Sequence, residues 1–449
     1  MTGTGPSLEE RLVALSGGGT DLAATGWQDR VRVLGTIGAR FLDDEDPLRV
    51  EALTRMPDDS GLSRPQCVDV VRRMAADWTV ERLDALVRAE FDDPAVLDGW
   101  VADLRAPGGR RLRAFPLGVG VGLHICAGTV PGVSVSSLIR GLLIGSPVLL
   151  KPGAGDRILP RLFLEGLSQL AGSDPVAHAL LNASAEVYWR GGVDDIEEAA
   201  LAGAGYVVVY GGTETIADVR RRTAQTTPVV GYGHRIGLAI VGAVDESTGV
   251  EVAAAVAAFD QRGCVSPQQV FFVGPHSDAK RLAEAIADGL ATLASELPLG
   301  VLTEGVASAV HQLRGTVELR QAAGEPVQVW AGPGVSWTVV LDPTEELKPS
   351  CGARTIHVTR VGSSSALESI LAPAGPFLQT VGLAGFSPHL HDDLADRVGR
   401  LGASRVVPLQ QVAYPPAWWI HDGQGPLRRL VRWVESGSTP GPAAAPHAR

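Results

Sequence analysis

The sequence predicts an α/β protein of two domains, each built around a largely parallel sheet. From residue 121 onward, short apolar stretches alternate with helical stretches of roughly ten residues, as in strands joined by crossover helices. The chain has 449 residues, which is too long for one ordinary core. Hydrophobic residues make up 45% and charged residues 20% of the chain, which is a globular composition.

Residues 1–110 are predicted to form amphipathic helices. Apolar side chains recur at three- and four-residue spacing over 27–42 and 80–104, so we expect a helix in each range. We expect this region to lead into the sheets and not to carry the chemistry.

The first sheet is predicted between residues 121 and 241. Its strands are expected at 121–126, 147–151, 186–189, 206–210 and 236–241. Helices are expected near 134–144, 159–170 and 194–202, and from residue 214. This alternation is typical of a doubly wound parallel sheet, which binds ligands at the carboxyl ends of its strands.

A helix at 250–260 leads into a second α/β block. Its strands are expected at 269–273, 327–331, 336–341, 355–360 and 377–383. From residue 435 the chain is rich in proline, glycine and alanine, which predicts a disordered tail. We therefore divide the chain into a first domain, 1–236, a second domain, 237–434, and the tail, 435–449.

Charge and cysteine content exclude several classes of function. A formal net charge of −11 gives no basic face for phosphates, so no nucleic acid is expected as a partner. The four cysteines have neither metal-site spacing nor the density of a disulfide framework, which fits a reducing cytoplasm. The start of the chain has no basic and apolar leader, and glycines and prolines interrupt the apolar residues 114–139. We expect a cytoplasmic protein with no membrane span.

Cys264 is the strongest candidate for a nucleophile. It lies between an alanine-rich helical run and an apolar strand, in Phe259-Asp-Gln-Arg-Gly-Cys264-Val-Ser-Pro. A cysteine on a turn at the end of an element can be reached from a cleft, and nearby backbone N–H groups can stabilise an oxyanion. A lone cysteine is more often a small buried hydrophobe, so its context must decide.

Two strand ends are candidates for a cofactor site. The strand 147–151 delivers Lys151 to its carboxyl end. Gly211, Gly212 and Thr213 follow the strand 206–210, where helix N–H groups and the helix dipole can receive a pyrophosphate, with Thr213 as the expected cap. Alone, such a turn is more often structural. The glycines of Gly118-Val-Gly-Val-Gly122 precede a strand and open no helix, so they do not form a dinucleotide fingerprint.

The order in which these short motifs follow one another along the chain resembles that of known protein families. Over about residues 110–275, it runs Pro116-Leu-Gly-Val, Gly128-Thr129-Val-Pro131, Leu149-Leu-Lys151-Pro, Tyr210-Gly-Gly-Thr213-Glu, Gly231-Tyr-Gly-His234 and Cys264. Further segments extend it to about residue 435: His124-Ile-Cys-Ala-Gly-Thr-Val-Pro-Gly132, Ser137-Leu-Ile-Arg-Gly141, Pro376-Phe-Leu-Gln-Thr-Val-Gly382 and Trp418-Trp-Ile-His421-Asp-Gly. The first set resembles the aldehyde dehydrogenase superfamily, and the second is similar to LuxC-type fatty acyl-CoA reductases.

The resemblance implies an aldehyde-dehydrogenase-like fold, with an NAD(P)-binding domain within 1–236 and a catalytic domain within 237–434. It implies that Cys264 attacks an acyl thioester, from acyl-CoA or an acyl carrier protein, and that hydride reduces the acyl-enzyme to an aldehyde. A thiolate nucleophile divides this conversion into thioester exchange and hydride transfer. The resemblance implies that the cofactor is contacted by Lys151, Gly211, Gly212 and Thr213. It also implies that the chain forms a homo-oligomer. Cys126 and Cys351 adjoin strand-like runs and are expected to be buried and inert.

Two positions depart from the superfamily pattern. Aldehyde-oxidising relatives carry a Glu that activates water; here Val230 takes that position and His234 that of the following Lys. Without this base, hydrolysis of the acyl-enzyme should be slow. Thr129 stands where the superfamily has an Asn that donates to the oxyanion, and we expect it to be an oxyanion or positioning group. Its hydroxyl is a shorter donor, so the Cys264 N–H is expected to carry more of that role.

The sequence gives some indication of whether the cofactor is NADPH or NADH. No Glu follows Lys151 within five residues to repel a 2′-phosphate, and Arg157 can add positive charge, which favours NADPH over NADH. No metal is expected, because His389-Leu-His391-Asp-Asp begins a helix after Ser387-Pro388. His421 is assigned no catalytic role. Two alternatives stay open, namely a non-redox acyl-thioester transferase or hydrolase, and a cofactor-binding scaffold that has lost catalysis.

Overall fold

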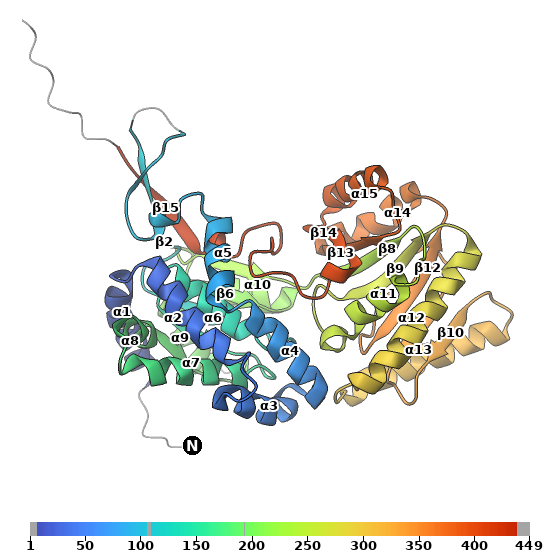
Figure 1. Cartoon of the computed structure of the whole chain (residues 1–449), viewed down its shortest axis with the longest axis horizontal. Coiled ribbons are helices and arrows are strands. Elements are labelled where there is room, and N and C mark those ends of the chain that lie inside the picture. The colour runs from blue at the N-terminus through green and yellow to red at the C-terminus, as the bar shows by residue number, and fades with distance from the viewer. Residues whose placement is uncertain (1–6, 106–108, 193, 438–449) are drawn as a thin grey trace, which may run out of the picture.

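The computed structural model describes residues 7–105, 109–192 and 194–437. It shows two α/β halves side by side, with a strand arm projecting from the first half (Figure 1). The N-terminal part is helical, as expected: α1 (Leu8–Ala23), α2 (Trp27–Arg40), α3 (Pro47–Ser60), α4 (Arg64–Ala76) and α5 (Val80–Glu90).

The predicted helix over 80–104 is wrong beyond residue 90. Phe91 has an extended backbone, and Asp93 caps a short 3₁₀ helix, η1 (Pro94–Leu97). Pro94 cannot continue a helix, because its nitrogen carries no hydrogen and its ring restricts the residue before it. The chain then enters strand β1 (Val101–Ala102), so the apolar spacing of this stretch reflects a turn and a strand.

The first sheet is parallel throughout, in the order β5-β4-β3-β6-β7. Its strands are β3 (Val121–Ile125), β4 (Val148–Lys151), β5 (Ser184–Glu186), β6 (Ala204–Tyr210) and β7 (Val229–Tyr232). The connecting helices are α6 (Val133–Leu143), α7 (Ile158–Ala171), α8 (Pro175–Asn182), α9 (Asp194–Ala202) and α10 (Thr213–Arg222). Successive residues of β6 face opposite sides, so that Val208 joins the core under the N-terminal helices and Val207 a smaller core beside α9.

The second sheet has the order β10-β11-β12-β9-β8-β13-β14, and only β10 is antiparallel to its neighbour. Its strands are β8 (Ile236–Val241), β9 (Pro267–Val273), β10 (Gln328–Ala331), β11 (Thr338–Leu341), β12 (Thr355–Val361), β13 (Leu378–Ala384) and β14 (Arg405–Pro408). The helices are α11 (Thr248–Ala257), η2 (Ala258–Gln261), α12 (His276–Glu296), α13 (Glu304–Ala322), α14 (Ser364–Leu371), η3 (Ala372–Phe377) and α15 (Pro388–Leu401). The strand at 236–241, expected in the first sheet, is β8, which lies inside the second sheet between β9 and β13, because strand pairing depends on long-range packing.

The last part of the chain returns from the second half to the first. It passes through η4 (Leu409–Gln411) and η5 (Arg428–Leu430) into strand β15 (Val431–Ser436). β15 pairs antiparallel with β2 (Arg111–Pro116), which pairs with β1 and completes the three-stranded arm. The ordered strand therefore includes Glu435 and Ser436, where the predicted tail begins, and residues 438–449 lie outside the described residues.

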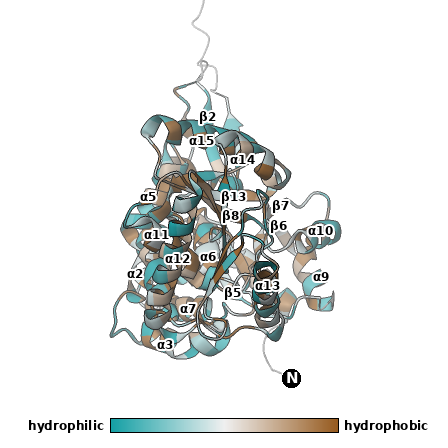
Figure 2. Cartoon of the chain, turned by 90° about the vertical axis from the view of Figure 1, so that its right-hand side faces the viewer, coloured by the Kyte–Doolittle hydropathy of each residue, from teal (hydrophilic) through white to brown (hydrophobic). Residues whose placement is uncertain are grey.

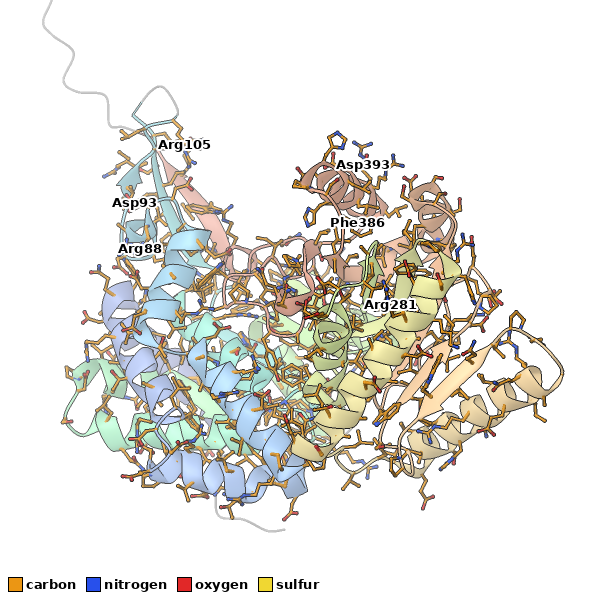
Figure 3. The ribbon with its side chains drawn as sticks, turned by 45° about the vertical axis from the view of Figure 1, so that its right-hand side comes forward. Arg88, Asp93, Arg105, Arg281, Phe386 and Asp393 are labelled. Atoms are coloured by element: carbon orange, nitrogen blue, oxygen red, sulfur yellow. The ribbon has the colours of Figure 1, made fainter. Side chains whose placement is uncertain are left out.

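Hydropathy follows the layers. The strands of the second sheet are hydrophobic and lie between helices whose outer faces are hydrophilic (Figure 2). Charged side chains such as Arg88, Arg281 and Asp393 point outward from the ribbon (Figure 3). Within the described ranges, no helix is long and apolar enough to cross a membrane.

Candidate active site

The strands that carry the predicted cofactor residues end at one edge of the first sheet. Parallel pairing places Ile125 of β3 level with Lys151 of β4 and with Val209 of β6. The chain leaves β3 toward β4 on one side, whereas β6 leads to β7 on the other, which is a topological switch point. Such a point opens a crevice at the carboxyl ends of the strands, where ligands bind in open α/β sheets.

Lys151 is buried at this edge, with 9% of its surface exposed. Its Nζ lies 5.8 Å from the ring centroid of Trp189, whose Nε1 donates a 2.9 Å hydrogen bond to Glu197. Burial lowers the pKa of Lys151, and the nearby Glu197 carboxylate opposes that shift. Among the described residues no carboxylate forms an ion pair with this ammonium, so its hydrogen-bond donors are available to a ligand.

Gly211, Gly212 and Thr213 lie between β6 and α10. The residue that caps α10 is Gly212, not the predicted Thr213: Gly212 has an extended backbone (φ −65°, ψ 165°), while Thr213 is already helical. Gly212, Thr213 and Glu214 are all exposed, and a Cβ atom at Gly212 would meet nothing within 4 Å. The start of α10 is therefore open to solvent, as an anion site at a helix N-terminus requires.

Arg157, expected to add positive charge near a 2′-phosphate, is already paired. Its Nε donates a 2.6 Å hydrogen bond to Asp59, and its guanidinium lies 5.1 Å from the ring centroid of Tyr188. Glu186 ends the neighbouring strand β5, and burial raises its pKa to about 7. The charge in this part of the cofactor edge is therefore more balanced than the sequence predicted.

Cys264 lies on the loop between η2 and β9 and is half-buried. Burial and the Asp422 carboxylate raise the pKa of its thiol to about 12, against hydrogen bonds from its own N–H, the Val265 N–H and Gln379. Cys126 is buried, as predicted, with 4% of its surface exposed. Cys351 is half-buried and not buried as expected, because the residues before β12 form a loop in which Gly352 has a φ of +67°.

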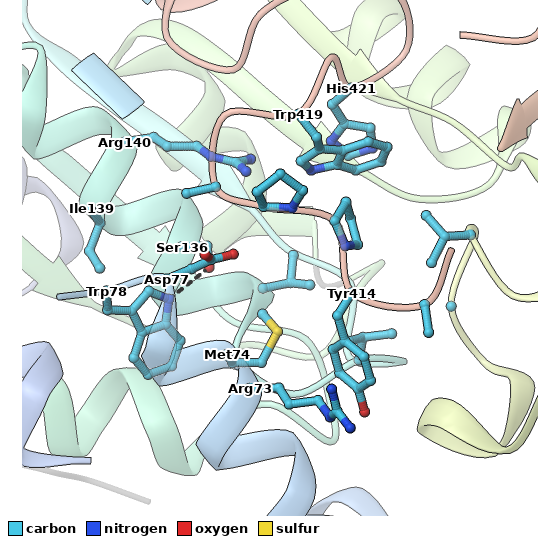
Figure 4. A pocket seen from close by; sticks show the side chains of 18 of the residues that line it. Arg73, Met74, Asp77, Trp78, Ser136, Ile139, Arg140, Tyr414, Trp419 and His421 are labelled. Atoms are coloured by element: carbon cyan, nitrogen blue, oxygen red, sulfur yellow. Dashed lines mark hydrogen bonds between the residues drawn. The ribbon is translucent and has the colours of Figure 1, made fainter. Parts of the chain in front are cut away.

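Cys264 lines an apolar cavity of about 160 Å³ (Figure 4). The cavity extends from the loop of Cys264 toward Trp78, in the turn between α4 and α5, and Ile139, on α6. Aliphatic and aromatic groups dominate its wall, which includes Met74, Trp78, Leu83, Leu86, Val130, Val133, Ile139, Phe259, Val265, Tyr414 and Trp419. Asp77 is the one carboxylate among the lining residues that the structure describes, and it pairs with Arg82 at 2.7 Å.

The segment 413–421, on the chain's return to the first half, forms one wall of this cavity. Two arginines fasten it to the helices. The Arg73 guanidinium lies 4.4 Å from the ring centroid of Tyr414, whose hydroxyl donates a 2.9 Å hydrogen bond to Asp69. The Arg82 guanidinium lies 4.2 Å from the ring of Trp418. The cavity is therefore formed by the packing of this returning segment on α4 and α5.

His421 also lines the cavity, although the sequence suggested no role for it. Its ring stacks on Tyr232 and on Trp419, each with centroids 4.3 Å apart. Burial and three nearby arginines hold the pKa of His421 well below its usual range, so the imidazole is neutral. The Trp418-Trp-Ile-His421 segment was the signal that could have indicated this position.

Thr129 and Val230, the two departures from the superfamily pattern, do not line the cavity. Thr129 is exposed on the loop after β3, and its neighbour Val130 reaches the cavity wall. Val230 is 7% exposed and belongs to the core. On the same face of β7, Tyr232 is the residue that reaches the stack with His421. His234, in the position of the superfamily Lys, is exposed.

No group of His, Cys, Asp or Glu in the described part of the chain has the geometry of a metal site. His389 and His391 lie at the start of α15, whose first residue is Pro388 and whose cap is Ser387. This is the helix start that the sequence predicted.

The comparisons agree with this fold. The family model described as acyl-CoA reductase (LuxC) matches residues 23–433. A long-chain acyl-protein thioester reductase of Aliivibrio fischeri is 23% identical over 424 residues, covering 90% of this chain and 81% of the relative. Another of the same description, from Photobacterium phosphoreum, is 24% identical over 352 residues, covering 78% of this chain and 68% of the relative.

Solved structures of aldehyde dehydrogenases share the fold. A putative methylmalonate-semialdehyde dehydrogenase from Sinorhizobium meliloti, complexed with NAD, has a TM-score of 0.72 at 15% identity and covers 97% of this chain and 90% of that one. An NADP-dependent glyceraldehyde-3-phosphate dehydrogenase from Bacillus halodurans, complexed with NADP, has a TM-score of 0.70 at 18% identity, covering 95% and 90%. The predicted aldehyde-dehydrogenase-like fold is confirmed, and the chain belongs to the LuxC family of acyl-CoA reductases.

Proposed function

We propose that this protein reduces an acyl thioester to an aldehyde with a nicotinamide cofactor, through an acyl-enzyme on Cys264. The observation that carries the proposal is the position of Cys264 in the wall of an apolar cavity, which Tyr210 also lines at the end of β6, the strand that leads into α10. An apolar cavity of this kind suits an acyl chain. Relatives described as long-chain acyl-protein thioester reductases support a thioester substrate.

The chemistry divides into two steps on one sulfur. The Cys264 sulfur loses its proton and attacks the thioester carbonyl; the carbon–sulfur bond to the donor breaks, and the departing thiol takes up a proton. The N–H groups of Cys264 and Val265 face the Cys264 sulfur and are the donors nearest to a developing oxyanion. A bound nicotinamide supplies the hydride that reduces the acyl group. Collapse of the resulting hemithioacetal releases the aldehyde and restores the Cys264 sulfur.

The residues at the sheet edge fit such a cofactor. Lys151 has donors available for a ribose or phosphate oxygen, and the N–H groups after Gly212 suit a pyrophosphate, with Gly211 and Thr213 on either side. We favour NADPH over NADH, because no carboxylate follows Lys151 to repel a 2′-phosphate. Because Arg157 is paired with Asp59, less positive charge is available for a 2′-phosphate, and the expected preference for NADPH over NADH is smaller.

The acyl donor in this proposal is acyl-CoA or an acyl carrier protein, and the working protein is a homo-oligomer. The arm supports the second point, since β15 forms an outer strand of its sheet and can pair with another chain. Domain roles follow the same division: the first sheet with its helices holds the cofactor, and the second supplies Cys264. Sedimentation of the purified protein tests the oligomer, with a monomer as the result that would contradict it.

One assay separates this proposal from the two alternatives. The protein is incubated with an acyl-CoA panel and NADPH or NADH, while cofactor absorbance, free CoA and aldehyde are followed. A reductase consumes one cofactor for each aldehyde and each CoA released. A transferase or hydrolase releases CoA without cofactor loss, and a scaffold binds cofactor without releasing CoA.

A further inference from the structure

The backbone is left-handed over the three residues 259–261, which precede Cys264 by three to five positions. Phe259, Asp260 and Gln261 have φ angles of 53°, 52° and 63°. A second left-handed pair, Ala353 and Arg354, has φ angles of 52° and 55°. This conformation is disfavoured for residues that carry a Cβ atom, so surrounding contacts must hold it.

Asp260 joins these two segments by a fully buried ion pair. The Arg354 guanidinium donates to Asp260 Oδ1 from Nε at 3.0 Å and from Nη2 at 2.7 Å, and both side chains have no exposed surface. The same Oδ1 accepts a 2.9 Å hydrogen bond from Gln66 of α4, and Oδ2 accepts one from the Gly300 N–H at 3.0 Å. Four donors from three separate parts of the chain therefore converge on the residue four positions before Cys264.

Gln261 closes the base of the loop that carries Cys264. Its Nε2 donates to the carbonyls of Pro267 at 2.8 Å and Thr355 at 2.9 Å, and its Oε1 accepts from the Thr355 N–H at 2.8 Å. Pro267 begins β9, just after the loop. The loop is thus pinned at both ends, with Cys264 between them.

Gln66 links this loop to the helices that form the cavity. It is fully buried on α4, and its Nε2 also donates to the Ala257 carbonyl at 3.1 Å. Further along α4, Arg73 and Met74 line the cavity. Figure 1 shows α4 at the side of the N-terminal helices that faces the second half.

We propose that Asp260 is a positioning residue for Cys264, and that Gln66 extends this positioning to the helices of the acyl cavity. The inference rests on the proposed function, in which Cys264 is the nucleophile. Holding the loop fixes the sulfur against the N–H groups of Cys264 and Val265 and against the end of the cavity. Loss of the contacts lets the left-handed turn relax, which moves the sulfur without removing any group that binds acyl chain or cofactor.

Gln66→Met tests this with little change in volume. We expect the rate of acyl transfer from acyl-CoA to fall about tenfold, because misplacement of a reacting group by about 1 Å can cost 10²-fold. The apparent constants for acyl-CoA and NADPH should stay within about twofold, since the variant leaves both binding surfaces in place. Alkylation of Cys264 by iodoacetamide should also slow about tenfold, because the N–H groups no longer support the thiolate.

Gln269→Met is the matched control. Gln269 is equally buried and also donates two hydrogen bonds from Nε2, to the Glu346 carbonyl at 3.0 Å and to Thr359 at 2.8 Å, but none to the loop. Both variants should lower the melting temperature, and only Gln66→Met should slow acyl transfer and alkylation. Equal slowing by both, or no slowing by Gln66→Met, would overturn the proposal.

Arg354→Lys provides a second variant that keeps the charge and loses the two-pronged contact with Asp260. We expect it to slow alkylation of Cys264 as well, and unchanged alkylation in a folded Arg354→Lys protein would also overturn the proposal. Alkylation needs no turnover. If the wild-type protein reduces no thioester at all, the proposed function fails while the alkylation comparison still decides whether Asp260 positions Cys264.

Discussion

The side-chain amide of Gln379 donates a 2.8 Å hydrogen bond to Oδ1 of Asp422 beside the Cys264 loop. Asp422 is also paired with Arg235 at 3.2 Å, and its backbone is left-handed, with a φ of 53°. The pair acts on the thiol in opposite directions: the Asp422 carboxylate raises the pKa of Cys264, and a hydrogen bond from Gln379 lowers it. With burial included, the pKa is about 12, so the resting thiol is protonated at neutral pH.

This protonation state predicts a pH dependence. Alkylation of Cys264 by iodoacetamide should rise about tenfold per pH unit from pH 7 to pH 9. As long as the pH is below the pKa, each unit by which the pH rises increases the thiolate fraction about tenfold. Asp422→Asn should lower the pKa and speed alkylation at pH 8, since it removes the negative charge and keeps the shape. The Cys264 peptide is followed by mass spectrometry, and a plateau near pH 7 would contradict the raised pKa.

Cys264→Ser should lower the rate of aldehyde formation by about 10³-fold or more, as removal of a covalent nucleophile does. Cys126→Ala should lower the melting temperature, because Cys126 is buried in the core, and Cys351→Ala should leave both stability and rate near wild type. After incubation with acyl-CoA alone, the acyl adduct should lie on the Cys264 peptide. An adduct on Cys126 or Cys351 would reassign the nucleophile.

Lys151→Ala should weaken cofactor binding about tenfold to a hundredfold, which corresponds to about 1.5 to 3 kcal/mol for a lost charged hydrogen bond. The apparent constant for acyl-CoA should change little. Fluorescence titration with NADPH and NADH measures the effect. Lys280→Ala, on the exposed side of α12, is the control and should bind both cofactors as wild type does. Unchanged affinity in Lys151→Ala would remove Lys151 from the cofactor site.

The acyl-enzyme should persist when no reduced cofactor is present. The groups near Cys264 that could act as a base for water are already engaged or weak. Asp422 is paired with Arg235 and Gln379, Asp77 is paired with Arg82, and burial and three arginines lower the pKa of His421; Val230 is a buried apolar residue. General-base help is worth about 10² to 10⁴ in rate, so hydrolysis without it is slow. Acyl-CoA should release one equivalent of CoA in a burst and then stop until NAD(P)H is added. Rapid, steady CoA release without cofactor would favour the hydrolase alternative.

Val230→Glu is a poor way to install that base. Position 230 lies in the core, so the variant buries a carboxylate with no partner, and we expect it to lose several kcal/mol of stability and not to gain hydrolysis. Thermal unfolding together with the chase of labelled acyl-enzyme checks this. A stable Val230→Glu protein with a short-lived acyl-enzyme would show that position 230 reaches the acyl group after all.

Ile139→Phe should shift the substrate preference toward shorter acyl chains. Ile139 lies at the end of the cavity remote from the Cys264 loop, so a larger ring there shortens the space for the chain. Forcing a long acyl chain against the larger side chain overpacks the cavity, which costs about 1 to 3 kcal/mol, so the longest chains should bind less well. The ratio of kcat/KM for long and short acyl-CoA measures the shift. Leu319→Phe, on the exposed face of α13, should leave that ratio unchanged.

Local features of the sequence were sufficient for much of the fold. The strands β4, β6 and β12 and the helices α6 and α9 lie close to the predicted ranges, because alternation and helical spacing are local properties. The turn that carries Cys264 also lies between a helix and a strand as expected. The prediction of one helix over 80–104 was wrong because the spacing of apolar residues does not account for Pro94, which cannot continue a helix.

The sequence by itself determined the fold class, the family resemblance and the candidate nucleophile, because each depends on residues close together in the chain or on their order. The tertiary structure decided which strands pair, as with β8 in the second sheet, and which side chains surround Cys264. His421 reached the cavity, Thr129 stayed exposed, and Asp260 met Gln66 and Arg354. These contacts join segments far apart in the chain, and burial and pairing between such segments depend on how the two halves pack, which no local pattern encodes.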